Sequence, residues 1–280
     1  NGQEGKLLTL RADSWIFLAP QFSNPEPADL ADLRVRQALS LAIDRPSLAD
    51  AIAGDGTLAG DLWLPRSDPQ YRTAAASVRQ QTYDPNAAVD LLAQAGWRRD
   101  GPDNGLVKHG QRFSPDLTTT VEWHSTAAIV ADYWRQVGVD PKESVVSLGN
   151  VFDRQNRATY SGAELMAGPP GLSLLDSRLR STNAPASDNF FAGANRGHYT
   201  NPDADRLLDR VWGTLDPSDR ARALGDLTQL IALELPISGL FFYPAMMLVR
   251  ADVRGVRVPE AIAPTGPVLV SWNAHEWEKK

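Results

Sequence analysis

Four histidines, one Gly-x-Ser sequence and 34 acidic residues are the groups in this chain that could catalyse a reaction. The histidines are scattered and form no H-E-x-x-H zinc pair; they are His109, His124, His198 and His275. Gly171-Leu172-Ser173 continues with two leucines, so it lacks the closing glycine of the G-x-S-x-G nucleophile turn. The chain has no cysteine, which excludes disulfides, thiolate nucleophiles and cysteine–metal sites. We therefore predict no catalytic residue, no metal site and no cofactor.

Two short sequences resemble binding motifs, but each has a better structural interpretation. Residues 54–59, Gly-Asp-Gly-Thr-Leu-Ala, fit a relaxed dinucleotide fingerprint, which must follow a strand. Here they follow a predicted helix, so a helix-ending turn is the better interpretation. Residues 100–105 resemble the start of a calcium loop, but Pro102 stands where a ligand oxygen is required and Gln111 occupies the twelfth position. We predict a hairpin turn there.

Aromatic and amide side chains in predicted loops are better suited to hold a solute. Ligand pockets are mostly apolar and contain a few well-placed polar groups. On this basis we predict ligand contacts from Trp15, Gln21, Asn189, Phe190 and Phe191, with Phe22, Trp63 and Asn24 as further candidates. Core packing is the more frequent role of any single aromatic residue. The adjacent Phe190 and Phe191, beside Asn189 in a glycine-containing segment, are the favoured pair.

Helical and extended segments alternate along the chain and must position these side chains. Residues 34–44 carry an apolar stripe with helical spacing, formed by Val35, Ala38, Leu39, Ala42 and Ile43. Asp32 is placed to cap this helix, and Pro46 suits the first turn of a second helix that continues to residue 53. Asn201-Pro202 and Asp216-Pro217 are predicted to start two later helices in the same way.

The remaining elements complete an α/β pattern. Extended segments are expected at residues 7–18, 113–123, 143–148, 163–167, 235–243 and 246–250, and further helices at residues 85–95 and 125–137. Asn150 is predicted to cap a short helix between two of these strands. This alternation is typical of α/β folds. Residues 168–197 are rich in Gly, Pro, Ser, Asn and Ala, and we predict a long loop, which in a compact domain is usually functional or disordered.

Composition narrows the class of protein. The chain has 280 residues, of which 42% are hydrophobic and 22% are charged, as in an ordinary globular protein with a sizeable core. The net charge of −6 is spread without a basic block, which disfavours nucleic-acid binding. No run of 18 apolar residues is present, so we expect no membrane span. Residues 1–6 lead directly into a strand-like segment, so no signal peptide is expected at the start of this chain.

Several segments between residues 30 and 245 match one family's motifs in the same order. They are the helix pair of residues 34–53, Tyr83-Asp84-Pro85 with residues 91–97, Asp100-Gly101 with Gly110, residues 136–139, Asn189-Phe190-Phe191 with residues 199–205, and the helix from Asp216 with the strand after Pro236. These segments closely resemble family-5 extracellular solute-binding proteins, the peptide and nickel receptors of ABC importers. The resemblance covers only the C-terminal half of such a protein.

The resemblance implies an α/β fold that is the second lobe of a two-lobed, type II periplasmic-binding-protein-like architecture, with a mixed sheet flanked by helices. It implies three parts: residues 1–30 as an inter-lobe strand and linker, 31–245 as the solute-binding lobe, and 246–280 as a return segment towards a missing first lobe. The expected partners are a small-molecule or peptide ligand, an ABC permease and that N-terminal lobe. The expected location is the periplasm or the extracellular face of the cell envelope, with a lipid anchor in a missing N-terminal segment.

The resemblance also implies a ligand loop in which an aspartate holds the amino terminus of a peptide. Aligning Ala167-Gly168 with the start of that loop places Pro169 at its tryptophan and Leu172 at its aspartate. A protonated amine in a cleft needs a paired carboxylate, because burying an unpaired charge is costly. With leucine at position 172, a free peptide amino terminus is disfavoured unless Asp176 or Asp188 reaches the site. A sugar, a lipid-like molecule or a capped molecule becomes an alternative.

Three roles remain open at this point. The main hypothesis is capture of a solute by lobe closure and its delivery to an ABC importer. Leu172 favours a second hypothesis, in which the receptor fold acts as a regulatory or scaffold lipoprotein without transport. A hydrolase is the weakest alternative, because the sequence presents no catalytic arrangement. Exposure of apolar surface that the first lobe would cover predicts some self-association of this chain by itself.

Overall fold

The computed structural model describes residues 5–78, 82–100, 105–257 and 271–279. Its centre is a five-stranded sheet in the order β6-β5-β7-β1-β8. The strands are β1 (Gly5–Pro20), β5 (Asp116–Thr120), β6 (Lys142–Val146), β7 (Ala163–Gly168) and β8 (Ser238–Arg250). Strands β5, β6 and β7 are mutually parallel, whereas β1 runs antiparallel to both β7 and β8. This arrangement confirms the predicted mixed sheet.

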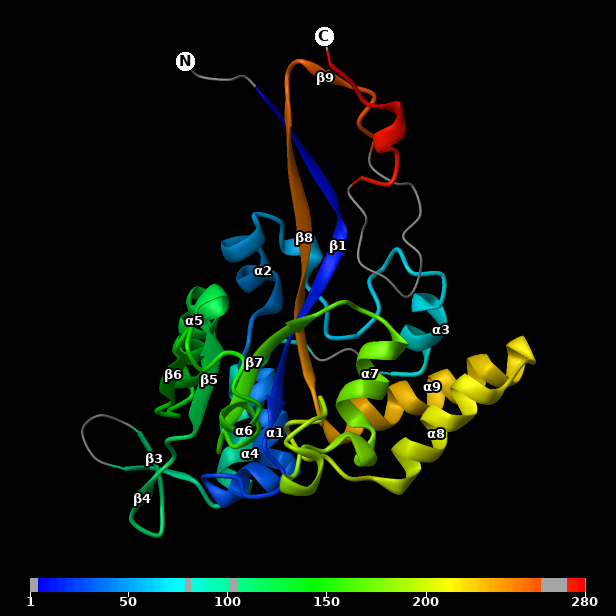
Figure 1. Ribbon diagram of the computed structural model, residues 1–280. Helices are drawn as coiled ribbons and strands as arrows, with labels where there is room; N and C mark the ends of the chain where they lie inside the picture. The colour runs from blue at the N-terminus through cyan, green and yellow to red at the C-terminus, as the bar shows by residue number, and fades with distance from the viewer. Residues whose placement is uncertain (1–4, 79–81, 101–104, 258–270, 280) are drawn as a thin grey trace.

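Helices cover both faces of the sheet, and the alternation of side chains along β1 separates two cores. Ile16 and Leu18 point into one core, whereas Trp15, Phe17 and Ala19 point into the other. The first core is completed by α1 (Leu33–Leu41), α2 (Arg45–Ala53), α4 (Pro85–Gln94) and α5 (His124–Gln136). The second is completed by α3 (Tyr71–Ala76), α7 (Leu172–Leu179), α8 (Pro202–Gly213) and α9 (Pro217–Glu234), which lie across the sheet from α5 (Figure 1).

Side-chain caps set the helix boundaries much as the sequence indicates. Asp32 accepts a hydrogen bond from the Arg34 N–H at the start of α1, and Asn201 and Asp216 cap α8 and α9. Helix α2 ends at Gly54 in the left-handed conformation, with φ of 73°. The predicted cap at Asn150 is wrong, because α6 (Arg154–Ala158) begins three residues later and is capped by Asp153.

The segment 168–197 is more ordered than predicted. Helix α7 occupies residues 172–179, and two 3-10 turns follow at Ser181–Asn183 and Ser187–Asn189. The predicted hairpin after α4 is present as β2 (Arg98–Asp100), β3 (Gly105–Lys108) and β4 (Gln111–Arg112). Its turn, residues 101–104, which includes most of the calcium-like sequence, lies outside the described residues. The two extended segments predicted on either side of residue 244 form the single strand β8.

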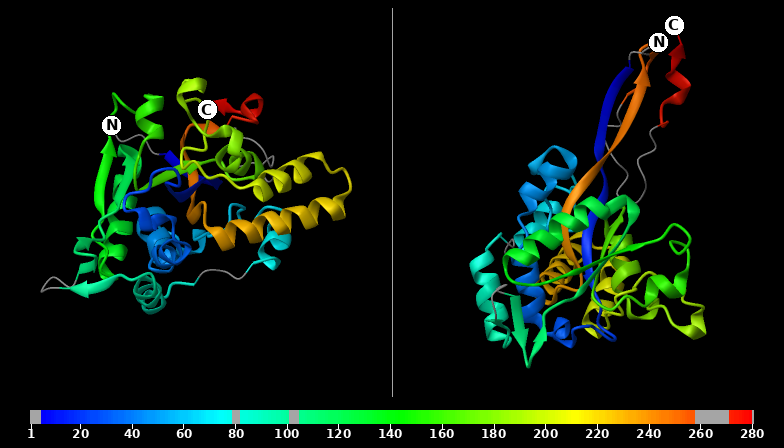
Figure 2. Two further views of the ribbon diagram at one scale, coloured as in Figure 1. Left: turned by 90° about the horizontal axis from the view of Figure 1, so that it is seen from below. Right: turned by 90° about the vertical axis from the view of Figure 1, so that its left-hand side faces the viewer.

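Strands β1 and β8 continue together far beyond the rest of the sheet. Gly168 is the last residue of β7 and lies opposite Trp15, so the earlier residues of β1 pair only with β8. The result is a two-stranded ribbon that projects away from the helices (Figures 1 and 2). Beside its outer end, β9 (Val253–Arg254) pairs with β10 (Glu278–Lys279). Every helix in the described part of the chain is too short or too polar to cross a lipid bilayer.

Candidate functional site

The parallel strands bring three connecting turns to one edge of the sheet. Because β5, β6 and β7 run in the same direction, their carboxyl ends lie together, and this is where α/β sheets usually bind ligands. We call this the carboxyl edge and define it by the turns at residues 121–124, 147–152 and 168–172. Gly168 lies opposite Trp15, so the carboxyl edge adjoins the base of the β1–β8 ribbon.

Three predicted ligand residues lie at or next to the carboxyl edge. Pro169 is exposed in the turn after β7, and Leu172 is half-buried in the first turn of α7, where it packs on the second core. Trp15 is fully buried in the second core. Its ring stacks on Phe17 with centroids 4.9 Å apart, and its indole N–H donates to the Gly60 carbonyl at 3.2 Å. Trp15 therefore packs in the core, and ligand contact remains a prediction for Pro169 and Leu172.

Gln21 lies at the opposite end of β7, and its amide group is fully used inside the protein. Its Nε2 donates to the carbonyls of Tyr160, at 3.0 Å, and Arg196, at 3.2 Å. Its Oε1 accepts the backbone N–H groups of Phe22 and Ser23. Because Pro20 pairs with Ala163, the first residue of β7, this network lies at the amino end of the parallel strands. The Gln21 side chain thus holds the backbone in place just after the end of β1.

Asn189, Phe190 and Phe191 also lie beyond the C-terminal end of α7, away from the carboxyl edge. Asn189 closes its own loop, accepting from the Ala186 N–H at 2.8 Å and donating to the Ala184 carbonyl at 2.9 Å. Phe190 is 83% exposed, whereas Phe191 is half-buried. Helix α7 lies between this group and Leu172 along the chain, and the hydrogen bonds of Asn189, Phe190 and Phe191 stay within their own loop. No described contact joins this group to Pro169 or Leu172.

Neither of the two nearby aspartates replaces the carboxylate that is missing at Leu172. Asp176 accepts hydrogen bonds from Arg180 at 2.6 and 2.8 Å, and this guanidinium also contacts Asp209 on α8. Asp188 lies in the 3-10 turn next to Phe190, at the other end of α7. The described ionisable side chains of the carboxyl edge are Glu122 and His124, both exposed, and the sequence-based list of candidates omitted them.

A polar cavity of about 370 Å³ lies on the sheet face that α6 covers. It begins at the carboxyl edge and runs along β5, β6 and β7. Its lining is mostly hydroxyl, amide and charged groups: Asp116, Thr118, Ser144, Val145, Val146, Ser147, Asn150, Asn156, Arg157, Thr159, Tyr160, Ser161 and Glu164. Its volume is in the range of small-molecule sites. None of the seven residues predicted to bind ligand lines this cavity.

Three arginines surround Glu164, which is buried at the inner wall of the polar cavity. Arg157 donates to the Glu164 carboxylate, and Arg196 approaches it at 3.1 Å. Arg178 lies in the same cluster and donates to the Ala194 carbonyl at 3.0 Å. Burial, together with repulsion from Arg196, lowers the pKa of Arg178 to about 10. Burial also lowers the pKa of Arg196, although Glu164 opposes this shift.

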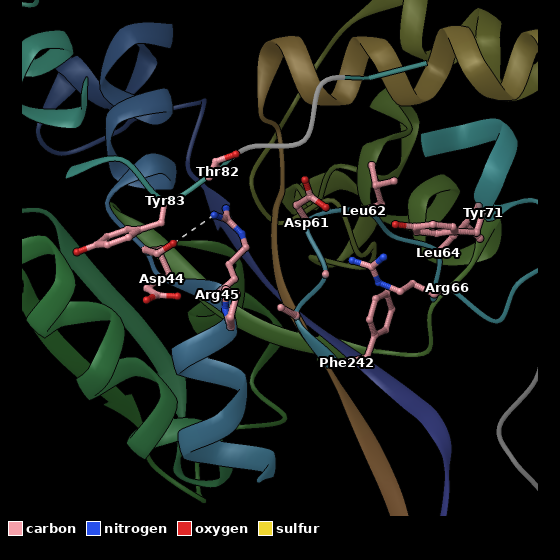
Figure 3. A pocket seen from close by; sticks show the side chains of 14 residues that line it. Asp44, Arg45, Asp61, Leu62, Leu64, Arg66, Tyr71, Thr82, Tyr83 and Phe242 are labelled. Carbon is pink, nitrogen blue, oxygen red and sulfur yellow. Dashed lines mark hydrogen bonds between the residues drawn. The ribbon is translucent and has the colours of Figure 1, made fainter. Parts of the chain in front are cut away.

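A second cavity, of about 250 Å³, lies beside β8 at the start of α2 (Figure 3). Asp44 and Tyr83 face it from one side, and Arg66 and Tyr71 from the other. Asp44 already caps α2, and Arg66 stacks over Tyr71 at 5.7 Å from the ring centroid. Arg45 at its base donates to the Gly239 carbonyl at 2.7 Å. Much of this polar lining therefore holds the local fold.

Within the described ranges, no three side chains of the metal-binding types His, Cys, Asp and Glu lie close enough to hold a metal ion. The described fold is an α/β lobe with a mixed sheet flanked by helices, and the ribbon of β1 and β8 projects from it. Residues 12–173 match the family model described as "Bacterial extracellular solute-binding proteins, family 5 Middle". The match covers more than half of the chain. The chain belongs to this family.

Two curated relatives extend the match to most of the chain. The oligopeptide-binding protein AppA of Bacillus subtilis (strain 168) is 24% identical over 257 residues, which make up 90% of this chain and 46% of AppA. The nickel-binding periplasmic protein of Escherichia coli (strain K12) is 29% identical over 251 residues, which make up 83% of this chain and 44% of that protein. The chain spans about half the length of the curated relatives it matches.

Solved structures confirm the type II periplasmic-binding-protein fold. NikZ from Campylobacter jejuni in complex with Ni(L-His) has a TM-score of 0.81 at 22% identity, covering 100% of this chain and 54% of NikZ. The oligopeptide binding protein from Thermus thermophilus complexed with pentapeptide has a TM-score of 0.77 at 24% identity, covering 90% of this chain and 45% of that one. At these identities the likeness establishes the fold.

Proposed function

We propose that this chain is the ligand-binding lobe of an extracellular solute-binding protein that delivers a small solute to an ABC importer. The observation that carries the proposal is the carboxyl edge, which adjoins the base of the projecting ribbon. In the proposed protein a second lobe would lie at the far end of that ribbon. A solute held at this edge would be enclosed when the two lobes close around it, and closure would present the complex to the permease. No bond is broken in this mechanism.

The side chains at the carboxyl edge limit which chemical groups of a solute could bind there. Leu172 offers no charge to a protonated amine, and the carboxylate of Asp176 is already held by Arg180. A peptide with a free amino terminus would therefore have to use Glu122 or a group from the other lobe. Solutes without an ammonium group need no such partner at this turn. The proposed solutes are accordingly small polar molecules or blocked peptides.

Native mass spectrometry of the intact protein, purified without refolding, tests this proposal. We expect a co-purified small molecule that leaves on denaturation, and its mass would distinguish a peptide from a sugar or lipid. The matched sample is the same protein after unfolding and refolding, which should have lost the extra mass. A protein that carries no solute, and that no member of a peptide and glycan library stabilises in thermal-shift assays, would contradict transport and favour the regulatory or scaffold role.

The same proposal places the protein outside the cytoplasmic membrane and gives it a lipid anchor. Support for this location comes from the family, whose members are extracellular or periplasmic solute-binding proteins. The anchor would belong to a segment of the intact protein that precedes this chain. Cell fractionation should find the intact protein with the membranes and release it with detergent, and recovery in the soluble cytoplasm would contradict this part of the proposal.

A further inference from the structure

The buried arginine cluster beside the polar cavity has more positive than negative charge. Arg157 and Arg196 contact the single carboxylate of Glu164, which is only 1% exposed, and Arg178 lies close enough to interact with it electrostatically. A fifth nearby charge is Asp116, which lines the same cavity and whose carboxylate accepts a hydrogen bond from the Ser161 hydroxyl at 2.7 Å. Even when Asp116 is counted, one guanidinium has no balancing carboxylate among the residues that the structure describes. Buried charges are normally paired, so a further anion would stabilise this region.

Several polar side chains that line this cavity have hydrogen-bonding groups without a partner in the described part of the protein. Arg157 lines the cavity with a side chain that is 11% exposed, and its buried Nε has no hydrogen-bond partner among the described residues. Five more lining side chains make no hydrogen bond to another described residue: Thr118, Ser144, Ser147, Asn150 and Asn156. Hydroxyl and amide groups arranged around a guanidinium are suited to an oxyanion on a polar solute, because carboxylate and phosphate oxygens accept several hydrogen bonds.

We propose that the polar cavity binds the carboxylate or phosphate group of the transported solute, with Arg157 as the direct ligand of that oxyanion. Glu164 orients the Arg157 guanidinium, and Arg178 and Arg196 add positive charge from behind. The five hydroxyl and amide side chains of the lining bind the polar body of the solute. The solute class is therefore an acidic, hydrogen-bonding molecule that needs no ammonium group, which agrees with Leu172 at the β7–α7 turn.

This inference rests on the proposed function, and calorimetry can test the two separately. The intact protein would be titrated in a buffer free of carboxylates and phosphate with D-glucuronate, D-glucose 6-phosphate and D-glucose. We expect at least one of the two anionic probes to bind tenfold or more tightly than the neutral sugar. The better of the two anions distinguishes a carboxylate site from a phosphate site.

Variants assign the effect to the cavity. Arg157→Gln should weaken binding of the anionic probe at least tenfold and remove the preference for this probe over glucose, because the guanidinium–oxyanion pair is lost. The control is Arg135→Gln on α5, across the sheet, where Arg135 pairs with Asp132 and Glu143. This variant should bind the anionic probe as tightly as the unaltered protein does. Asn150→Ala, a substitution at an exposed position, should weaken binding of the anionic probe severalfold. This variant tests the cavity even if Arg157→Gln does not fold.

Three outcomes would overturn the inference. They are equal affinity for charged and neutral probes, no measurable binding of either anion, and unchanged binding by both Arg157→Gln and Asn150→Ala. If the protein nevertheless retains another solute in native mass spectrometry, the transport proposal stands and only the oxyanion site is wrong. If no solute binds in either experiment, the proposed function itself is wrong.

Discussion

Arg45 is buried between α1, α2 and β8 and joins these elements through its guanidinium. It donates to the carbonyls of Gly239, at 2.7 Å, and Ser40, at 3.1 Å. It also donates to the hydroxyls of Ser40 and Ser238, at 2.7 and 3.1 Å. Burial lowers the pKa of Arg45 to about 10, so the side chain remains charged at neutral pH. The network satisfies buried acceptors on α1 and β8 and so links both elements to α2.

Replacing Arg45 with methionine should lower the free energy of unfolding by about 3 kcal/mol, because several buried acceptors lose their donor. Urea denaturation monitored by tryptophan fluorescence measures this change. Arg206→Met is the matched control, since Arg206 is 65% exposed and pairs only with Asp203 among the described residues, across one helical turn. The control should change stability by less than about 0.5 kcal/mol. Equal losses in the two variants would argue against a structural role for Arg45.

Single residues differ in how far the sequence alone reveals their role. The Asp32 cap and the turn at Gly54 are predictable because the local chain determines them. Gln21 and Asn189 are not, because an amide in a loop can bind either a solute or distant backbone groups. Glu164 did give a signal: it is the only charged residue in the short predicted strand 163–167, and a glutamate buried in such a strand requires a cation nearby. Its arginines lie far apart in sequence, so only the fold shows which ones meet it.

At the scale of elements, the cap of α9 makes the stability of the longest helix depend on pH. Asp216 accepts hydrogen bonds from the Ser218 hydroxyl at 2.6 Å and from the Ser218 and Asp219 N–H groups at 3.0 and 2.8 Å. These bonds, led by the Ser218 hydroxyl, lower the pKa of Asp216. A lowered carboxyl pKa stabilises the fold above its unfolded value, and the contribution is lost as the pH falls below about 4.

Asp216→Asn should therefore reduce the loss of stability between pH 7 and pH 3, because asparagine caps the helix without titrating. Urea midpoints at the two pH values, compared with the unaltered protein, measure the difference. The control is Asp226→Asn on the exposed side of the same helix, where the aspartate accepts no side-chain hydrogen bond from a described residue. A variant at Asp216 that loses as much stability in acid as the unaltered protein would rule out this cap as the cause.

The prediction of a loop at residues 168–197 failed for an identifiable reason. Leu172, Leu175 and Leu179 follow helical spacing, but the many glycines, prolines and asparagines around them favoured the prediction of a loop. In the structure, Leu174, Leu175 and Leu179 are buried in the second core with Met166 of β7. Tertiary packing thus stabilises an eight-residue helix whose length alone would leave it marginal. Because α7 separates the two ends of the segment 168–197, the ligand residues predicted in this segment fall into two groups.

At the scale of the whole molecule, one face of the ribbon exposes apolar side chains to solvent. Leu7 pairs directly with Leu248, and they are 59% and 75% exposed. Met246 lies two residues along β8 on the same face and is 54% exposed. Strands with an exposed apolar face favour association with another protein surface. We propose that a first lobe covers this face in the intact protein; in this structure the face is exposed to solvent.

This chain by itself should therefore self-associate through the ribbon. Light scattering across a concentration series should show a mass that rises above that of the 30.5 kDa monomer. Leu248→Ser should shift the distribution towards monomer, because it removes apolar area from the centre of the exposed face. Leu215→Ser is the control: Leu215 is also strongly exposed, but it lies in the α8–α9 turn rather than on the ribbon, and its loss should not change the mass. A monomer at every concentration, or equal effects of the two substitutions, would mean that the ribbon face is not an association surface.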